Sequence, residues 1–403
     1  DRSTLNLAFE ALGKPHEISL WGRGNEDDAR LVADFKKVVE AAAAVFGGTA
    51  PYERYVFILH VASGAGGGLE HANSTVMGVS PFAFTKKEPY RNLLALAAHE
   101  YFHLWLVKRI RPEPLGPFDY ETENYTRMLW LMEGGTDYYA DLIVKRAGLM
   151  TEDEFYGELA MQIQTIQRTP GRRRMSLEQA SFDAWIEYYR QNEHSINDQI
   201  SYYTKGHVVS AMLDLEIQRR TANARSLDDV MRYLWANYGQ KDRGIPEGAV
   251  QSAVETVAGS KFEEFFDKYV RGTDEIDYDA FLAHAGRKLV AEVPKDGSRI
   301  DAERRGAWLG ANVADSGGRT IVTGVLEGSP AWRAGVNAND ELLAFDGARV
   351  NATTLNDRLA DRAPGDTAIL TVFRRDQLRQ IEVPLGERPA DTFRIEKVKK
   401  DEE

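Results

Sequence analysis

The spacing of apolar residues changes along the chain and divides it into two regions. In the first 290 residues, short β-like runs come first and helix-like segments follow. The alternating segment 16–21 and the apolar segment 52–61 predict strands, and the apolar-periodic segment between them predicts a helix capped by Asn25. From residue 151 to about 289, nearly every segment has helical spacing. This region is therefore predicted to combine a small β-sheet with a larger set of helices.

The pattern changes again near residue 305. A polar stretch at 293–297 predicts a domain boundary, and β-like runs with interleaved short helices then predict a small α+β domain of about 80 residues. The last residues are rich in charge and predict a tail. The resulting division assigns 1–95 to a β-rich lobe, 96–292 to a helical lobe with the candidate site, 303–388 to the small domain and 389–403 to the charged tail.

Length and composition limit the classes of function. The chain has 403 residues, which is too long for one compact domain. With 50 basic and 62 acidic residues its net charge is -12, which disfavours nucleic acid or an anionic membrane as the main partner. No apolar run is long enough to predict a membrane span, and the first four residues do not form a signal peptide. Because the chain contains no cysteine, a transition metal would have to bind histidine and carboxylate side chains.

Two histidines in an apolar, helix-forming segment are the strongest candidate site. His99 and His103 are four residues apart, so on a helix both imidazole rings project from one face and can bind one Zn²⁺. Glu100 would lie beside the metal, where it can take a proton from a water molecule whose pKa the ion lowers to about 7. Two core histidines that are held by hydrogen bonds are the alternative interpretation.

A second predicted helix, from about Asn124 to Lys145, contains a glutamate among apolar neighbours. A carboxylate at such a position is costly unless another charge compensates it, so Glu133 is the best candidate for a third metal ligand. Asp137, one turn later, can accept a hydrogen bond from a ligand imidazole. A solvated carboxylate on the helix face is an equally good interpretation of Asp137.

Two further segments carry candidate substrate-binding residues. Glycines at 66–68 precede Glu70 in what reads as an edge strand, where a peptide backbone can approach closely and pair. Phosphate binding is weakly supported because no Lys-Ser/Thr follows, and a glycine-rich surface loop is the other alternative. Tyr202 and Tyr203 precede an apolar helix. Paired tyrosines usually pack, but in a zinc peptidase a phenol often donates a hydrogen bond to the developing oxyanion.

These motifs together resemble a known family. The stretch HEYFHLWLVKRIRP (99–112), followed by MEGGTDYYADL (132–142), closely resembles the glycyl aminopeptidase family of bacterial zinc peptidases. The stretches GGGLEHANS (66–74) and YYTKGHVVSAMLD (202–214) support the match. Several motifs in the same order make this resemblance specific.

The small domain carries a second resemblance. The segment 307–385 is similar to bacterial PDZ domains, notably in GSPAWRAGVNANDELLAFDGARV (328–350). The two resemblances together imply an α+β protein with a thermolysin-like gluzincin catalytic domain followed by a PDZ domain. In PDZ domains the backbone N–H groups of one loop receive the C-terminal carboxylate of a peptide, and that loop corresponds here to Trp308, Leu309 and Gly310.

The family resemblance also implies a role for each candidate residue. It implies one zinc ion per chain, a general base at Glu100 and an oxyanion donor at Tyr203, or at Tyr202 if the register differs. It implies that Glu70 holds the free α-amino group of the substrate. The implied zinc ligands are His99, His103 and Glu133, and the further substrate-binding residues are Gly67, Gly68 and Tyr202.

The sequence departs from the family pattern at two points. Leu106 stands where family members more often have a polar residue, commonly asparagine, which predicts an altered contact behind the metal ligands. Members also begin with a β-sandwich domain, and this chain starts near the end of that domain. This difference predicts a truncated or processed form.

We therefore expect a zinc aminopeptidase that removes small N-terminal residues, glycine or alanine, from peptides. The preference for glycine rests on the family resemblance alone. The alternatives are an endopeptidase of the same fold, in which Glu70 is only structural, and a PDZ peptide-binding scaffold with a vestigial zinc site. The expected partners are peptides with a free N-terminus and, at the PDZ domain, C-terminal peptides. A periplasmic or secreted bacterial protein is slightly favoured over a cytoplasmic one.

Overall fold

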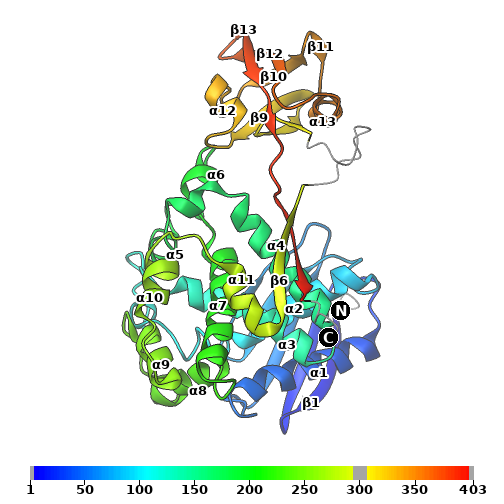
Figure 1. The fold of residues 1–403 in the computed structure, drawn as a ribbon. Helices are drawn as coiled ribbons and strands as arrows, with labels where there is room; N and C mark the ends of the chain where they lie inside the picture. Colours follow the sequence, from blue (N-terminus) through cyan, green and yellow to red (C-terminus); the bar gives the residue numbers. More distant parts are fainter. Residues whose placement is uncertain (1–3, 294–305, 399–403) are drawn as a thin grey trace, which may run out of the picture.

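The computed structural model describes residues 4–293 and 306–398 (Figure 1). Residues 294–297 of the predicted domain boundary and 399–403 of the predicted tail lie outside the described residues. Among the described helices, none combines the length and the apolar character that crossing a membrane requires.

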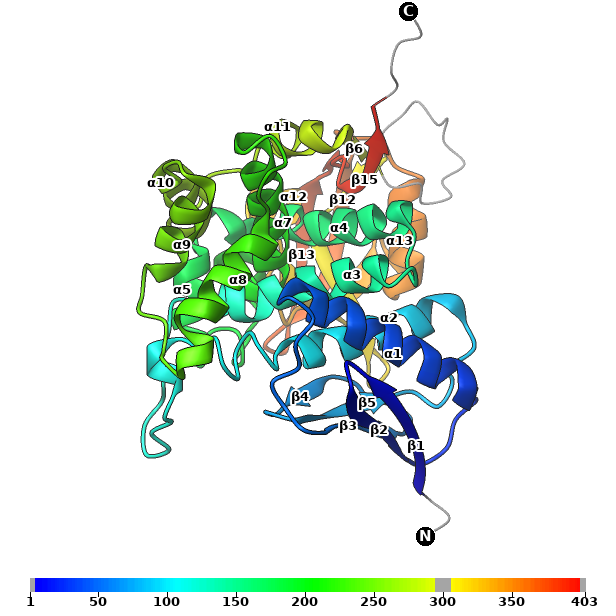
Figure 2. The same ribbon diagram turned by 90° about the horizontal axis from the view of Figure 1, so that it is seen from below.

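A five-stranded mixed sheet forms the β-rich lobe (Figure 2). Its strands are β1 (Thr4–Ala11), β2 (Lys14–Trp21), β3 (Tyr55–Val61), β4 (Gly68–Glu70) and β5 (Ser74–Val79). They lie in the order β1-β2-β3-β5-β4, in which β2, β3 and β5 are parallel. The short strand β4 pairs antiparallel with β5 at one end of this order, so among the described strands its outer edge has no partner. Such an edge can pair with another extended chain.

Two helices cover one face of this sheet, as Figure 2 shows. They are α1 (Asp28–Val45) and α2 (Lys87–Phe102). Phe35 of α1, Phe57 of β3 and Tyr101 of α2 are completely buried between the layers. The apolar residues of α2 thus hold the helix on the sheet and fix the position of its last turn, which carries the candidate site.

The prediction that Asn25 caps the first helix is wrong. Asp27 is the cap, because its side chain accepts a hydrogen bond from the backbone N–H of Arg30 (3.0 Å). Asn25 instead donates to the hydroxyl of Thr85 (2.8 Å) and joins the loop before α2.

The helical lobe is built around α7 (Tyr202–Arg220), which is buried along most of its length. It contacts the π-helical turn η2 (Trp130–Gly135), α3 (Thr136–Arg146) and α4 (Glu152–Gln167). The helix predicted from about Asn124 begins only at Trp130, because Glu247 accepts hydrogen bonds from the hydroxyl of Thr126 and the N–H of Arg127. The other helical segments are η1 (Glu113–Leu115), η3 (Pro170–Arg173), α5 (Leu177–Phe182), α6 (Ser195–Asp198), α8 (Leu227–Asn237), η4 (Gly239–Lys241), α9 (Ala249–Ala258), α10 (Glu263–Phe266), η5 (Asp267–Arg271), α11 (Tyr278–Leu282) and η6 (Ala283–Ala285).

The small domain has a hydrophobic core of its own, with Phe345, Leu370 and Val372 almost fully buried at its centre. Its sheet has the order β13-β12-β10-β9-β8, with β11 paired to β10, so β8 lies at one edge. A second pair, β7 with β14, lies beside it. The elements are β7 (Ala307–Trp308), β8 (Ala311–Ser316), β9 (Arg319–Val325), α12 (Pro330–Ala334), β10 (Glu341–Phe345), β11 (Ala348–Arg349), α13 (Ala352–Ala360), β12 (Thr367–Arg374), β13 (Gln377–Pro384) and β14 (Gly386–Glu387).

The prediction of a charged tail from residue 389 is wrong for residues 392–397. These form β15 (Thr392–Lys397), which pairs antiparallel with β6 (Arg287–Glu292) and packs against α4 (Figure 1). Phe393 and Ile395 pack against the core of the helical lobe between charged neighbours, which explains why the segment is ordered despite its composition. The chain therefore leaves the helical lobe, forms the small domain and returns.

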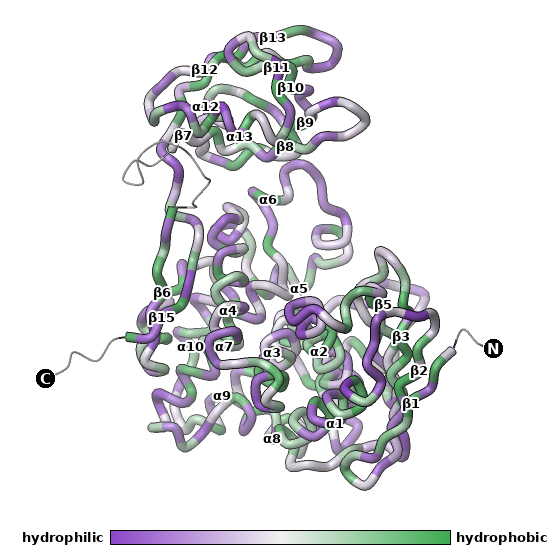
Figure 3. The backbone as a smooth tube through the Cα atoms, turned by 90° about the vertical axis from the view of Figure 1, so that its right-hand side faces the viewer, coloured by the Kyte–Doolittle hydropathy of each residue, from purple (hydrophilic) through white to green (hydrophobic). Residues whose placement is uncertain are grey.

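The small domain also contacts the segment that precedes α7 (Figures 1 and 3). Asn197 of α6 is almost completely buried there. Its side chain donates to the backbone oxygen of Val325 (2.8 Å) and accepts from the N–H of Glu327 (2.9 Å). Arg174 adds an ion pair with Glu327 at 2.5 Å. These contacts fix the small domain against the helical lobe.

Candidate metal centre and substrate cleft

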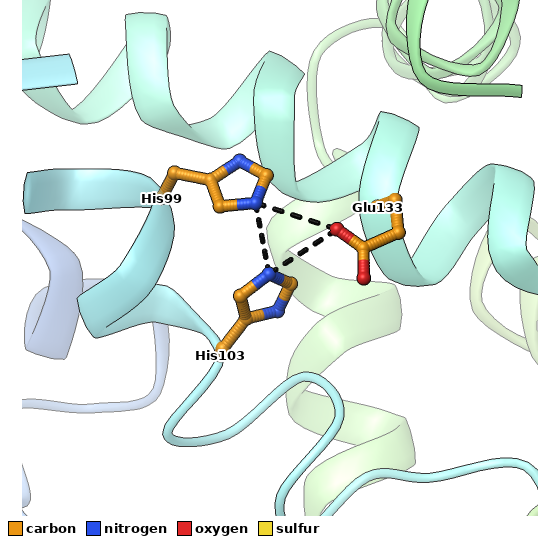
Figure 4. A group of neighbouring side chains, drawn as sticks. All are labelled: His99, His103 and Glu133. Atoms are coloured by element: carbon orange, nitrogen blue, oxygen red, sulfur yellow. Dashed lines mark hydrogen bonds and ion pairs between the residues drawn. The ribbon is translucent and has the colours of Figure 1, made fainter. Parts of the chain in front are cut away.

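Three potential metal ligands lie together at the end of α2 (Figure 4). His99 lies in the last turn of this helix and His103 is its C-cap, where the four-residue spacing places both rings on one face. Glu133 comes from η2. The two Nε2 atoms are 2.9 Å apart, and each lies 3.4 Å from Oε2 of Glu133. In the described part of the chain, no other three histidine or carboxylate side chains come together in this way.

The distances between these atoms fit one tetrahedral metal ion. A triangle with sides of 2.9, 3.4 and 3.4 Å has its corners about 1.9 Å from a common centre, close to the ~2.0–2.2 Å of zinc–nitrogen and zinc–oxygen bonds. Two imidazoles and one carboxylate are also a donor set that zinc accepts in catalytic sites. The three residues therefore fit a zinc ion.

Hydrogen bonds to the other ring nitrogens fix the orientation of both histidines. Nδ1 of His99 lies 2.8 Å from Oδ1 of Asp137, and Nδ1 of His103 lies 3.0 Å from the backbone oxygen of Leu106. Each Nδ1 donates to an oxygen acceptor, which leaves each Nε2 lone pair free for a metal. Because the backbone of Leu106 makes the second contact, the apolar side chain at this position does not interrupt it.

The charges around the three ligands favour a cation at their centre. Burial opposes ionisation of Glu133, but His103 and His99 outweigh it and hold the pKa of this carboxyl well below its usual range. Burial likewise opposes charge on His99, yet Asp137 and Glu133 raise the pKa of this ring well above its usual value. The buried carboxylates and the imidazoles therefore stabilise one another's charged forms. A bound metal ion can take the place of the proton that gives the imidazole its positive charge.

Glu100 lies next to the ligands and faces the edge strand. Its carboxylate is so close to Gly68 that a Cβ atom at that position would lie 2.2 Å from Oε1, so a side chain there would displace the carboxylate of Glu100. Burial raises the pKa of Glu100, and His99 and His103 oppose this increase. A carboxylate with a raised pKa is well suited to accept a proton and pass it on.

A close crossing of two segments brings the tyrosine motif to the metal centre. Gly134 of η2 packs on Gly206 of α7, and a Cβ atom at residue 134 would lie only 2.5 Å from the Cα atom of Gly206. Glu133 precedes the first glycine, and Tyr203 lies one helical turn before the second. The two glycines therefore allow the approach that places Tyr203 near Glu133, whose charge contributes to the raised pKa of Tyr203.

The structure places Tyr203, and not Tyr202, at the cleft. Tyr203 lines the cleft with His99 and Glu100. Tyr202 does not line the cleft: it is 1% exposed, its hydroxyl lies 3.3 Å from that of Tyr189, and its ring stacks on that of Tyr203. Burial, followed by the charge of Glu133, raises the pKa of Tyr203, so its phenol stays protonated and can donate a hydrogen bond.

Glu70 ends β4, and its Oε1 lies 3.0 Å from Nζ of Lys108. Lys108 follows Val107, which has a φ of 110°, a conformation that is strained for a β-branched residue. The sequence analysis did not identify Lys108. A lysine that follows a helix gives no local sign that its partner is a glutamate 38 residues earlier, so only the tertiary structure reveals this pair.

A cleft of about 460 Å³ opens over these residues. Its wall includes the predicted residues Gly67, Gly68, Asp137 and Tyr203, together with His99 and Glu100. The residues that line it and that the sequence analysis did not single out are Ala95, Leu96, Ala140, Asp141, Glu158, Gln162 and His207. One metal-ligand candidate, His99, thus lines the same cleft as the general-base candidate and the start of the edge strand.

In the small domain, Trp308 ends β7, and Leu309 and Gly310 connect it to the edge strand β8. Gly310 has a φ of 75°, and a Cβ atom there would lie 2.2 Å from that of Ser329, so the turn requires glycine. Helix α13 contacts both β7 and β8. A larger hollow of about 880 Å³ lies between this domain and His194, but none of the predicted site residues lines it, and among the described residues no three histidine or carboxylate side chains come together there.

Two protein-family models match the segments of the chain that contain the candidate metal centre and the small domain. The M61 glycyl aminopeptidase family model matches residues 92–209, which contain the two histidines, Glu100, Glu133 and Tyr203. The PDZ domain family model matches residues 307–385. No curated protein sequence matches the chain significantly.

Two kinds of solved structure are similar to this chain. A crystal structure of an aminopeptidase N family protein from Idiomarina loihiensis has 28% sequence identity and a TM-score of 0.91, and the match covers 98% of this chain and 69% of that one. Two structures of the HtrA-type protease AlgW with a decapeptide match 21% of this chain and 30% of theirs, with 24 and 25% identity and TM-scores of 0.20.

The family match and the structural neighbour support a peptidase as the class of this protein. More specifically, the chain carries an M61 glycyl aminopeptidase domain and a PDZ domain, which confirms the resemblance drawn from its motifs.

Proposed function

We propose that this chain is a zinc aminopeptidase that removes small N-terminal residues from peptides, with a catalytic lobe of the thermolysin-like gluzincin type. The observation that carries this proposal is the convergence of His99, His103 and Glu133 on one point beside Glu100 and Tyr203, at an open cleft. A bound zinc ion supplies Lewis-acid polarisation of the peptide carbonyl and lowers the pKa of water to about 7.

The protein residues supply proton transfer and charge stabilisation. Glu100 accepts the proton of the attacking water molecule and delivers it to the leaving amine, a task that suits its buried position and raised pKa. The phenol of Tyr203 donates a hydrogen bond to the oxyanion that develops on the carbonyl oxygen. Asp137 and the backbone of Leu106 keep the two imidazoles in their ligand orientation.

The free N-terminus is the group that sets the cleavage position in this proposal. A peptide that pairs with the open edge of β4 brings its first residue to Glu70. The α-ammonium group then shares this carboxylate with Lys108, and the first carbonyl lies beside Glu100. The preference for glycine or alanine rests on the family match.

Lys108 also supports a second candidate function, an endopeptidase of the same fold. Because Lys108 already pairs with Glu70 at 3.0 Å, a substrate without a free amine does not leave this carboxylate unpaired. The free-energy cost of binding a substrate without a free amine is therefore lower than it would be if Glu70 had no cationic partner.

One set of assays separates these functions. The purified chain is tested with the arylamides of glycine, alanine, leucine and N-acetylglycine, with and without a chelator. We expect cleavage of the glycine and alanine compounds, weaker cleavage of the leucine compound, none of the acetylated one and loss of all activity with chelator. Equal cleavage of free and acetylated glycine would identify an endopeptidase, and full activity in the chelator would overturn the zinc assignment.

In the small domain, we propose that the loop 308–310 receives the carboxylate of a peptide C-terminus, and that the peptide pairs with the edge strand β8. The glycine turn at 310 and the contact of α13 with β8 support this assignment. Fluorescence anisotropy with a labelled peptide, in free-acid and C-terminal amide form, tests it. Tighter binding of the free acid is expected, and equal binding of both forms would contradict it.

A further inference from the structure

The lining of the cleft extends beyond the catalytic residues to helices α3, α4 and α7. These three helices contact one another (Figure 2). Its wall there is formed by Asp141 of α3, Glu158 and Gln162 of α4, and His207 of α7. Over its whole length the cleft is lined by four carboxylates and by no lysine or arginine. This end of the cleft is therefore rich in carboxyl groups, and a cation that enters it can favour their ionised form.

Asp141 is a buried carboxyl group that the proposed mechanism does not use. Its side chain is 14% exposed, and in the described part of the chain no hydrogen-bond donor reaches either oxygen. Burial, followed by the charges of Glu158 and Asp137, raises the pKa of Asp141 to about 8. The nearest cation, Arg91, forms ion pairs with Glu158 and Glu154, and it offsets this shift only in part.

His207 is a second buried polar group without a partner. Its side chain is 2% exposed, and among the described residues Nε2 has no hydrogen-bond partner. This atom lies 3.9 Å from Oδ2 of Asp141, too far for a hydrogen bond. Burial lowers the pKa of His207 to about 4, so the ring is neutral and adds no positive charge. A buried polar atom such as this Nε2 is rarely left unsatisfied, so a molecule in the cleft, a water or a ligand, is expected to contact it.

The position of the Asp141 end of the cleft relative to the edge strand indicates which part of a bound peptide would enter it. The cleft is lined by Gly67 and Gly68 at the start of β4, but not by Glu70 at its end. A peptide with its N-terminus at Glu70 and its first carbonyl beside Glu100 has to continue past Gly67 toward α4. The side chain of its second residue therefore lies nearest to Asp141.

We propose that this end of the cleft is a subsite for the cationic side chain of a lysine or arginine at the second position of the substrate, and that Asp141 determines this specificity. The inference rests on the proposed aminopeptidase function. An ammonium or guanidinium group placed here donates hydrogen bonds to Asp141 and returns this carboxyl to its ionised form. It supplies the cationic partner that Asp141 lacks, because Arg91 pairs with Glu158 and Glu154 and no lysine or arginine among the described residues lines the cleft.

The test measures glycine release from two dipeptide amides, Gly-Lys-amide and its Nε-acetyl-lysine counterpart, which lacks the positive charge. For the zinc-loaded wild-type chain we expect kcat/KM to be about 10- to 100-fold higher for the charged compound, the range of one charge-assisted hydrogen bond. Asp141→Asn should bring the ratio close to one, whereas Asp141→Glu, which keeps the charge, should retain a ratio well above one. Glu88→Gln, the same charge change on the exposed start of α2, should keep the wild-type ratio.

Each outcome has a distinct meaning. Release of no glycine from either compound overturns the proposed function, whereas equal release from both by the wild-type chain overturns only the subsite. The wild-type ratio decides this without any variant, so the proposal stays testable if Asp141→Asn does not fold. A high wild-type ratio that persists in a folded Asp141→Asn variant would show that another group recognises the charge.

Discussion

Removing Lys108 should increase the preference of the enzyme for free N-termini. In the structure, Nζ of Lys108 lies 3.0 Å from Oε1 of Glu70, where it competes with the ammonium group of a substrate. Lys108→Gln removes this competitor and leaves Glu70 with no cation of its own. A free amine then gains more by binding, and an acetylated substrate leaves an unpaired carboxylate.

The size of the effect follows from this distance. Two unit charges 3.0 Å apart attract by about 1.4 kcal/mol at the dielectric constant of water and by about 5.5 kcal/mol at an effective value of 20. Because the side chains of Lys108 and Glu70 are still 25 and 17% exposed, solvent screening places the pair near the lower value, at about 1–2 kcal/mol. This corresponds to a gain of about 5- to 30-fold in selectivity.

The assay compares kcat/KM for an internally quenched peptide with a free and with an acetylated N-terminus. Lys108→Gln should raise the ratio of free to acetylated substrate, Glu70→Ala should bring it close to one, and the double variant should match Glu70→Ala. Lys86→Gln, an exposed lysine at the start of α2, is the control for the loss of one positive charge. If Lys108→Gln instead lowers the ratio to the value of Glu70→Ala, Lys108 orients Glu70 and does not compete with the substrate.

Three further predictions concern the base, the oxyanion donor and the last strand. Glu100→Gln should keep one zinc ion per chain by metal analysis and lose turnover of a glycine arylamide, and an active variant would show that the base is another group. Tyr203→Phe should lower kcat by about 10²–10³ with unchanged zinc content, whereas Tyr202→Phe should have a small effect, and the reverse result would contradict the placement of the two phenols. A chain that ends at residue 388 lacks β15 and the packing of Phe393 and Ile395. The free energy of unfolding of its helical lobe should therefore be about 2–3 kcal/mol lower than in a chain that ends at 398. Equal thermal midpoints for these two chains would show that β15 does not stabilise the lobe.

Local sequence rules were sufficient for the parts of the site that lie on one helix. The four-residue spacing of His99 and His103 requires only helix geometry, and the structure brings their Nε2 atoms within 2.9 Å. Glu133 could be selected because an ionised group among apolar residues needs a compensating charge. Its distance from the histidines depends on how η2 packs against α2, which no local pattern specifies.

Other features depend on contacts between segments that are far apart in the sequence. Gly134 and Gly206 can be read from the sequence, but their direct contact depends on how η2 packs against α7. The same packing decides that Tyr203, and not Tyr202, lines the cleft. Strand β15 looked like a charged tail because its pairing partner β6 lies about 100 residues earlier. Lys108 and Asp141 were missed for the same reason, since the burial and the partners of a charged side chain are properties of the tertiary structure.

A zinc titration of the metal-free chain tests the central claim most directly. The rate of glycine arylamide hydrolysis is measured while zinc is added in fractions of one equivalent. We predict no activity at the start, a linear increase and a plateau at one zinc ion per chain, because His99, His103 and Glu133 form a single site in the described part of the chain. Full activity before any zinc is added, or no activity after one equivalent is bound, would contradict the account.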